Sequence, residues 1–215
     1  MTRIVVDTSG IETLEELLVA LERRGADPEE RRAFDEAIWA AKGTDGTVMT
    51  TDLSGFTRLT RTHGILHFLS IFRRCQQAAL PLITQHGGVL LKQEADDLIG
   101  LFPDPERGLA CALAIQVVCA RINADRDEDD RIGLCVGIDH GRFLRLSDDA
   151  FGDPVNVAYK LGEDVAKPGE VLISARAYAL ALEKGFDPGG LILSGPLSVD
   201  AGHVLLEHYS LRLGG

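Results

Sequence analysis

A charged turn between two apolar segments is the feature that most constrains the fold of this chain. Residues 87–102 read GGVLLKQEADDLIGLF, which is the pattern of a β-hairpin. Helical periodicity lies on both sides of it, over residues 56–87 and 105–123. A hairpin between two helices requires antiparallel strands inside the sheet. This pattern favours a ferredoxin-like sheet over a doubly wound parallel sheet, in which strands and helices alternate throughout.

The neighbouring segments complete a recognisable order. Residues 46–53 predict a strand before the first of these helices, and residues 131–141 predict a strand after the second. The order indicates an α+β fold with a ferredoxin-like βαββαβ core and an antiparallel sheet. Further elements are expected downstream: a helix over 154–166, a strand over 170–174, a helix over 177–185, and a closing pair of strands over 191–195 and 203–213.

The first part of the chain has a different pattern. Residues 11–24 and 28–42 each place apolar side chains at helical spacing, and the sequence between them, which holds Gly25 and Asp27-Pro28, ends one helix and starts the next. We therefore divide the chain into an N-terminal helical extension, residues 1–42, and a main domain, residues 43–215. A helical hairpin packed on that domain is favoured over a signal-transmitting coiled coil, because no heptad pattern persists.

Charge and apolar content limit the classes of partner. The formal net charge of −11 would repel a nucleic-acid backbone or an anionic membrane. Acids interrupt the N-terminus where a signal peptide needs an apolar core, and no apolar run approaches the ~20 residues of a membrane span. The four cysteines lie in apolar segments without C-x-x-C spacing and are interpreted as reduced core residues. A cytoplasmic location, without membrane or nucleic-acid binding, is expected.

Two carboxylates mark a candidate site for a cation and a phosphate. Asp52 ends the first strand of the core, and the SGFT segment, 54–57, leads from it into a helix whose first N–H groups suit a phosphate. Asp96 lies in the charged hairpin turn. Singly, each residue is most often a helix cap or a turn residue. On neighbouring central strands the two carboxylates come close, and such oxygen ligands suit Mg²⁺ or Mn²⁺ bound with a phosphate.

Four segments, in this order, carry a resemblance to a known family. They are TDLSGFTRLTRTHG, GGVLLKQEADDLIGLF, VGIDHGR and FGDPVNVAYKLGEDVAKPGEVLIS. Over about Thr47 to Ser174 the chain resembles the class III nucleotidyl cyclase catalytic domain, the homology domain of adenylate and guanylate cyclases. The resemblance implies a head-to-tail homodimer in which each active site lies between two chains.

The resemblance also implies a set of metal and phosphate ligands. Asp52 and Asp96 match the two metal-binding aspartates, and Leu53 would add its carbonyl oxygen. Asp97 falls at a position that the family does not use for metal and is treated as a turn residue. Two Mg²⁺ or Mn²⁺ ions would activate the ribose 3′-hydroxyl and neutralise the leaving pyrophosphate. The β- and γ-phosphates would lie on the backbone N–H groups of Ser54, Gly55, Phe56 and Thr57.

The partner chain would supply the base pocket. Lys92 and Asp149 match the residues that contact the purine in adenylate cyclases. A donor from Lys92 and an acceptor from Asp149 fit the N1 acceptor and N6 donor of adenine, and guanine presents the reverse pattern. ATP is therefore the favoured substrate. Cytosine presents a similar pair at N3 and N4, so CTP stays open.

Three residues match groups around the reacting phosphate. Asn156 matches an asparagine that positions the ribose, and Arg142 matches an arginine that reaches the triphosphate. Lys160 stands where most active members have an arginine that stabilises the pentavalent phosphate. A lysine keeps the charge without the bidentate fork, so a slower enzyme is expected.

Two further departures from the family pattern concern the backbone. Ala95 replaces the usual glycine before the second metal aspartate. The segment between Arg142 and Asp149 has about half its usual length, which shortens the arm that clasps the partner chain and leaves the dimer geometry open.

The sequence therefore predicts a class III nucleotidyl cyclase that converts ATP to 3′,5′-cyclic AMP and pyrophosphate, with nucleotide and a second copy of the chain as partners. Two alternatives stay open. One is a degenerate domain that binds nucleotide or a protein without turnover, and the other is a cyclase that prefers CTP or GTP.

Overall fold

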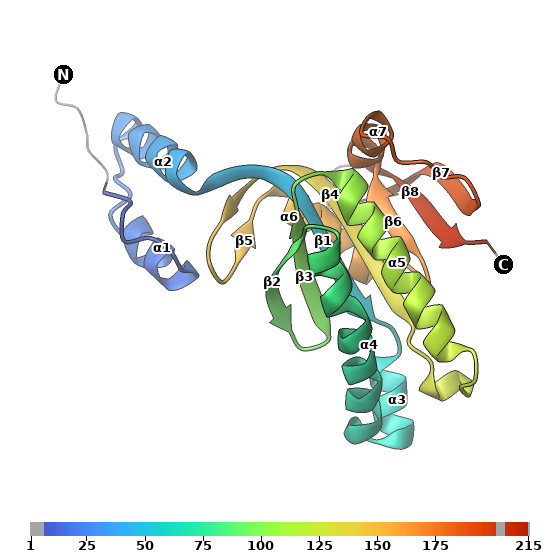
Figure 1. The fold of residues 1–215 in the computed structure, drawn as a ribbon. Coiled ribbons are helices and arrows are strands. Elements are labelled where there is room, and N and C mark those ends of the chain that lie inside the picture. Colours follow the sequence, from blue (N-terminus) through green and yellow to red (C-terminus); the bar gives the residue numbers. More distant parts are fainter. Residues whose placement is uncertain (1–6, 201–204, 215) are drawn as a thin grey trace.

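The strands of the central sheet follow the order β2-β3-β1-β4-β6-β8-β7, and β5 pairs with the end of β4 (Figure 1). The computed structural model describes residues 7–200 and 205–214. β1 runs antiparallel to both β3 and β4, and β4 runs parallel to β6. The strands are β1 (Gly43–Leu53), β2 (Val89–Glu94), β3 (Asp97–Phe102), β4 (Leu134–Arg145), β5 (Ala150–Phe151), β6 (Val171–Ser174), β7 (Leu191–Asp200) and β8 (Leu205–Leu213).

Helices pack on both faces of this sheet. The larger core joins one face to α4, α5 and α7, and a smaller core joins the other face to α6. β1 is buried without a break over residues 46–51, with Val48 in the smaller core and Met49 in the larger one. Such a continuous run is typical of a central strand covered on both faces. The helices are α1 (Leu14–Leu21), α2 (Pro28–Lys42), α3 (Phe56–His63), α4 (Ile65–Gln85), α5 (Pro105–Asn123), α6 (Asp153–Tyr159) and α7 (Ala175–Glu183).

The expected α+β fold is confirmed, with corrections to the bounds of several elements. The order β2-β3-β1-β4 is that of the ferredoxin-like core, and α5 begins and ends as the sequence predicts. The helical stretch 56–87 is two helices, because Gly64 adopts φ +87° between α3 and α4. The helix expected over 154–166 is α6 followed by a π-helical turn, Lys160–Val165. The first two residues of the last expected strand, at 203–204, lie outside the described part of the chain.

The N-terminal helices project from one end of the sheet (Figure 1). Thr13 and Glu16 form a capping box that starts α1, and Asp27 with Pro28 starts α2. The two helices share a small core with the end of β4. A helical hairpin packed on the rest of the chain is therefore observed, and α2 leads directly into β1 at Gly43. The division into two domains at this point stays a prediction.

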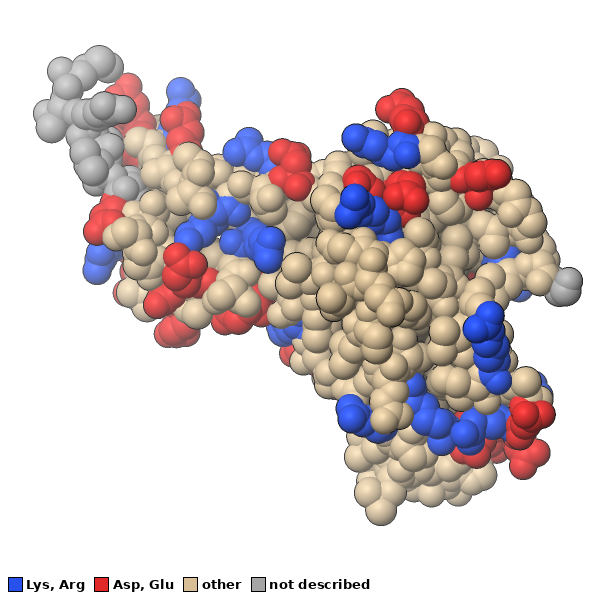
Figure 2. Space-filling view, in the orientation of Figure 1, with Lys and Arg blue, Asp and Glu red and all other residues tan. Residues whose placement is uncertain are grey.

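Charged side chains of both signs are interspersed on the surface. Figure 2 shows Lys and Arg next to Asp and Glu over the N-terminal helices and at the lower end, with few charges over the centre of this face. This face carries no broad basic patch of the kind that binds nucleic acid. No helix of the described residues is both long and apolar enough to cross a membrane. The cytoplasmic location stays a prediction.

A close backbone contact fixes α6 on the sheet. A Cβ atom at Gly137 of β4 would fall well inside contact distance of the Ala158 carbonyl oxygen and the Gly162 nitrogen. Thr50 of β1 adds a hydrogen bond, since its Oγ1 donates to the Ala158 carbonyl at 2.9 Å. The contact positions the helical segment that carries Asn156 and Lys160.

We expect Gly137→Ala to lower the free energy of unfolding by about 2–3 kcal/mol, because α6 must shift to admit one methyl group. Urea titration measures the change. Gly10→Ala is the control, since no atom lies within 4 Å of a Cβ built there. Equal stability of the two variants would contradict the packing described above.

Candidate active site

Three aspartates converge where β1 ends beside the β2–β3 turn. One carboxylate oxygen each from Asp52, Asp96 and Asp97 lies within 4.8 Å of the other two. Leu53 directly follows Asp52 as the last residue of β1. The expected approach of Asp52 and Asp96 is therefore observed, whereas metal ligation by these residues and by the Leu53 carbonyl stays a prediction.

The strand register explains why Asp97 joins the pair. β1 and β3 pair Thr51 with Leu98, so the next position along the ladder sets Asp52 opposite Asp97. The sequence analysis assigned Asp97 to the turn, but β3 begins at this residue. Extending the β1–β3 pairing by one residue beyond Thr51 and Leu98 predicts the contact between Asp52 and Asp97. Ala95 holds φ +48° in the turn, the conformation that a glycine adopts without strain.

Burial and mutual repulsion make these acids hard to ionise. Burial raises the pKa of Asp52, and the charge of Asp96 raises it further. Burial likewise raises the pKa of Asp96. The pKa of Asp97 rises to about 7, through burial first and then through the charges of Glu163, Asp96 and Asp52. A cation bound among the three carboxylates would offset this charge.

Glu163 is a fourth acid that the sequence reasoning did not single out. It lies in the π-helical turn after α6, and its pKa is raised by burial and then by the charge of Asp52. Nothing in the local sequence signals this approach, because it depends on how α6 packs across the sheet.

The aspartates fit a divalent cation. Oxygens on opposite sides of a six-coordinate Mg²⁺ are about 4 Å apart, so a set within 4.8 Å closes on such an ion with small side-chain shifts. Asp97 Oδ1 is also buried without a hydrogen-bond partner among the described residues. A cation would satisfy this atom, which otherwise bears the cost of an unpaired buried oxygen.

The segment proposed to hold phosphates lies next to this cluster. Gly55 adopts φ +92° at the start of α3, and no side chain caps the helix. The Ser54 N–H donates to the Gly133 carbonyl at 2.9 Å. Of the four predicted phosphate donors, the Ser54 amide is therefore engaged within the protein, and the amides of Gly55, Phe56 and Thr57 remain candidates.

Lys92 and Asp149, the predicted base-contacting residues, form an ion pair. Lys92 Nζ lies 3.0 Å from Asp149 Oδ2 and 2.8 Å from Glu94 Oε2. These two carboxylates, Glu94 first, raise the pKa of Lys92. The pair joins β2 to the start of β5, two segments far apart in the sequence. The structure thus brings these two residues together, and their role toward a base stays a prediction.

Asn156 and Lys160 line one cavity of about 430 Å³. The two residues lie one helical turn apart, so they point into the same space, as the sequence predicts. Lys160 Nζ is also bonded to Asp164 Oδ2 at 2.9 Å. The lining of this cavity contains none of the three aspartates and neither member of the Lys92–Asp149 pair.

Arg176 shares this cavity and was missed by the sequence reasoning. Its guanidinium pairs with the fully buried Asp139 and lies 2.6 Å from Asp153 Oδ2. The Ser174 hydroxyl also donates to Asp139. A buried carboxylate needs partners of this kind. These contacts join β4 to the first residues of α6 and α7. The one sequence signal for them is an acidic residue, Asp139, within a predicted β-strand.

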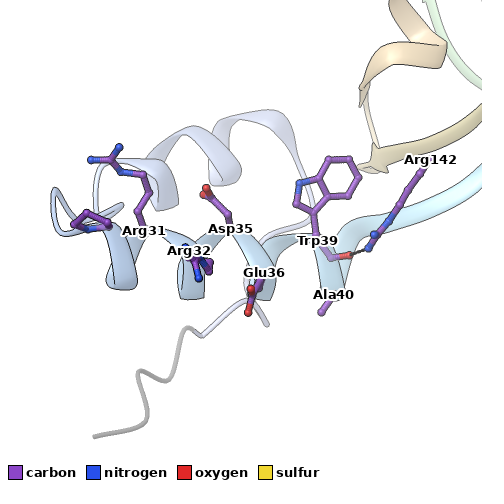
Figure 3. Close-up of a pocket in the computed structure, with 8 residues that line it drawn as sticks. Arg31, Arg32, Asp35, Glu36, Trp39, Ala40 and Arg142 are labelled. Carbon is purple, nitrogen blue, oxygen red and sulfur yellow. Dashed lines mark hydrogen bonds between the residues drawn. The ribbon is translucent and has the colours of Figure 1, made fainter. Parts of the chain in front are cut away.

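Arg142 lies away from the aspartates of its own chain. It pairs in register with Asp45, whereas Asp52 pairs with Cys135. Positions 45 and 52 are seven residues apart, about 23 Å along a strand. The Arg142 guanidinium instead stacks on the ring of Trp39 in α2, 5.0 Å from its centroid, and donates to its carbonyl at 3.4 Å (Figure 3). Its contact with the triphosphate stays a prediction.

Comparison with known proteins gives relatives that match part of the chain. No protein-family model matches the chain. The chain is 32% identical over 125 residues to the serine/threonine-protein kinase pkn2 of Myxococcus xanthus, covering 58% of this chain and 15% of that protein. It is 34% identical over 128 residues to a Rhizobium meliloti protein named as a candidate adenylate cyclase, covering 59% of this chain and 22% of the relative. The chain therefore spans less than a quarter of the length of these two relatives.

A solved structure matches over more of the chain. An adenylate/guanylate cyclase/hydrolase from Silicibacter pomeroyi superposes with a TM-score of 0.65 at 26% identity, covering 80% of this chain and 98% of that one. The four sequence segments, the sheet order and the fold of this neighbour agree with one another. The chain therefore has the fold of an adenylate/guanylate cyclase catalytic domain and is similar to the class III nucleotidyl cyclase family in its four sequence segments.

Proposed function

We propose that the chain converts ATP to 3′,5′-cyclic AMP and pyrophosphate. The observation that carries the proposal is the meeting of Asp52 and Asp96 at the end of β1, in a cyclase fold. In the reaction the ribose 3′-oxygen forms a bond to the α-phosphorus as the bond to the pyrophosphate oxygen breaks, and the hydroxyl proton is released. Two Mg²⁺ or Mn²⁺ ions, when bound, would supply charge stabilisation for both oxygens.

The residues of the chain would orient the reactants. Asp52, Asp96 and the Leu53 carbonyl are the proposed cation ligands, and Asp97 lies close enough to join them. The amides at the start of α3 would hold the terminal phosphates. Asn156 would hold the ribose, and Lys160 would place its charge beside the pentavalent phosphorus.

The Lys92–Asp149 pair supports adenine as the base. An adenine inserted between the two side chains would accept from Lys92 at N1 and donate to Asp149 from N6. The 3.0 Å contact between them would then be replaced by two hydrogen bonds of matching polarity. Guanine would set a donor against the ammonium and an acceptor against the carboxylate, which is unfavourable at both positions.

A homodimer with shared sites is part of the proposal. Asn156 and Lys160 line a cavity that does not include the aspartates, which supports a site shared between two chains. A second chain docked head to tail would bring the Asn156 cavity of one copy toward the aspartates of the other.

A nucleotide-binding domain without turnover is the second candidate. Lys160 is held by Asp164 and has no guanidinium fork, which favours weak stabilisation of the transition state. The two candidates differ in whether cyclic product forms when the purified chain is incubated with each nucleoside triphosphate and Mn²⁺.

Asp52→Asn and Asp96→Asn should each lower cyclic AMP formation at least about 100-fold, because each removes a ligand of the ions that stabilise the transition state. Both variants should also lose the increase in Tm that Mn²⁺ gives the unchanged protein. Mass spectrometry of the product and thermal unfolding measure the two effects. Asp125→Asn, an exposed acid in the loop after α5, is the control. Full activity in Asp96→Asn together with loss in Asp97→Asn would mean that Asp97 is the second ligand.

Asp97→Asn should raise the Tm of the metal-free protein at pH 8.5 by about 2–4 °C, the shift that ~1 kcal/mol gives in a chain of this size. Asp97 has a pKa of about 7 when folded and 3.8 as the ordinary value, so its ionisation destabilises the fold above pH 7. Lowering the pH toward 5 protonates the folded form and should shrink the difference between the variant and the unchanged protein. A difference that stays constant from pH 8.5 to pH 5 would argue against the raised pKa.

Mixing Asp52→Asn with Lys92→Ala protein should restore about a quarter of the unchanged activity, because half of randomly mixed dimers are heterodimers with one intact site. Chain exchange is verified by native mass spectrometry of an isotope-labelled partner. Each variant incubated separately should stay inactive. Continued inactivity after verified exchange would place the complete site within one chain.

A further inference from the structure

The segment between β4 and β5 determines where Asp149 lies. Residues 146–149 form a tight connection in which the Leu146 N–H donates to the Asp149 carbonyl at 2.8 Å. The Asp149 carboxylate accepts from the Ala150 N–H at 2.9 Å through Oδ1 and from Lys92 through Oδ2. A shift of this short segment therefore moves the carboxylate that faces Lys92.

Helix α1 holds the segment from outside the sheet. The Ser147 N–H and hydroxyl both donate to the Glu12 carbonyl, at 2.8 and 3.0 Å. In the other direction the Leu14 N–H, at the first position of α1, donates to Asp148 Oδ1 at 3.0 Å. Asp148 thus satisfies a helix N–H that has no partner within α1, and the two chain segments are joined by reciprocal bonds.

Apolar packing and charge fasten α1 and α2 to the same place. The Leu146 side chain is buried in a core with Ile11 and Leu17 from the first segment and Phe34 and Ile38 from α2. Lys42, the last residue of α2, forms an ion pair with Glu12 at 2.8 Å. These contacts hold residues 146–149 in place within one chain, although this segment is shorter than the arm expected to contact a partner chain.

A second contact ties α2 to β4 just before this segment. Arg142 stacks on Trp39 and bonds to its carbonyl, so the last turn of α2 follows the end of β4 (Figure 3). α1, α2 and residues 142–149 therefore form one connected unit, with Asp149 at its edge.

We propose that the N-terminal helices set the base preference of the nucleotide site, and that Asp148 is the positioning residue that transmits their placement to Asp149. The inference rests on the proposed function, because it assigns Asp149 to the base. Discrimination between adenine and guanine depends on an acceptor held at one position. If the α1 contact is removed, Asp149 can move away from Lys92. The affinities of the site for adenine and guanine nucleotides then become more similar.

The test compares Asp148→Ala with Asp148→Asn in the full chain. Asparagine keeps an oxygen that accepts from the Leu14 N–H, and alanine removes it. Asp187→Ala is the matched control, because Asp187 is also exposed and accepts from a backbone N–H, that of Gly189 at 2.9 Å, in the loop after α7. Binding of 3′-deoxy-ATP and 3′-deoxy-GTP is measured by calorimetry with Mn²⁺, since neither analogue can cyclise. Amide hydrogen exchange of Leu14 and residues 147–151 is measured without nucleotide.

We expect Asp148→Ala to speed exchange at these amides and to reduce the ratio of the two affinities about tenfold, the effect of one hydrogen bond. Asp148→Asn and Asp187→Ala should keep the ratio of the unchanged protein. An unchanged ratio in Asp148→Ala, in a protein that prefers the adenine analogue, would overturn this inference and leave the proposed function standing. Failure of the unchanged protein to bind either analogue would overturn the proposed function, and this inference with it.

Discussion

The pairing of β1 between β3 and β4 is the constraint on which the rest of the structure depends. β1 matches β4 over eleven residues and β3 over five, and it is buried on both faces at its centre. Its last residues deliver Asp52 to the hairpin turn, and its first residue continues α2. The acid cluster and the N-terminal helices therefore occupy opposite ends of one strand. A slip of one residue would turn Asp52 to the other face of the sheet and separate it from Asp97.

The buried and partly buried acids of this protein have two kinds of environment. Asp139 is fully buried, and Arg176 and Ser174 compensate its charge within the protein. Asp52, Asp96 and Asp97 are partly buried and repel one another, with raised pKa values. The first arrangement stabilises the position of α6 and α7. The second leaves a charge that an external cation can offset, and the proposed metal site rests on this difference.

The N-terminal helices contact the segment next to Asp149, although they lie far from it in the sequence. Their small core includes the end of β4, and their backbone is bonded to residues 147 and 148. The shortened arm was expected to leave the dimer geometry open. In this structure the same segment is fastened by α1, so its conformation within one chain does not depend on a partner. The role proposed for these helices rests on that attachment and not on a coiled coil.

Local sequence determined the elements, their order and the approximate site, because periodicity, caps and turn residues act over a few positions. It predicted the β2–β3 hairpin, the bounds of α2 and α5, and the approach of Asp52 to Asp96. It did not predict the break at Gly64 or the π-helical turn at Lys160–Val165. The contacts of Asp97, Glu163 and Asp139 depend on strand register and on helices packed across the sheet. Tertiary structure also decided that Arg142 stacks on Trp39 and that α1 holds Asp148. Both contacts join residues about a hundred or more positions apart. A local sequence pattern does not indicate which distant segment will pack against a given surface.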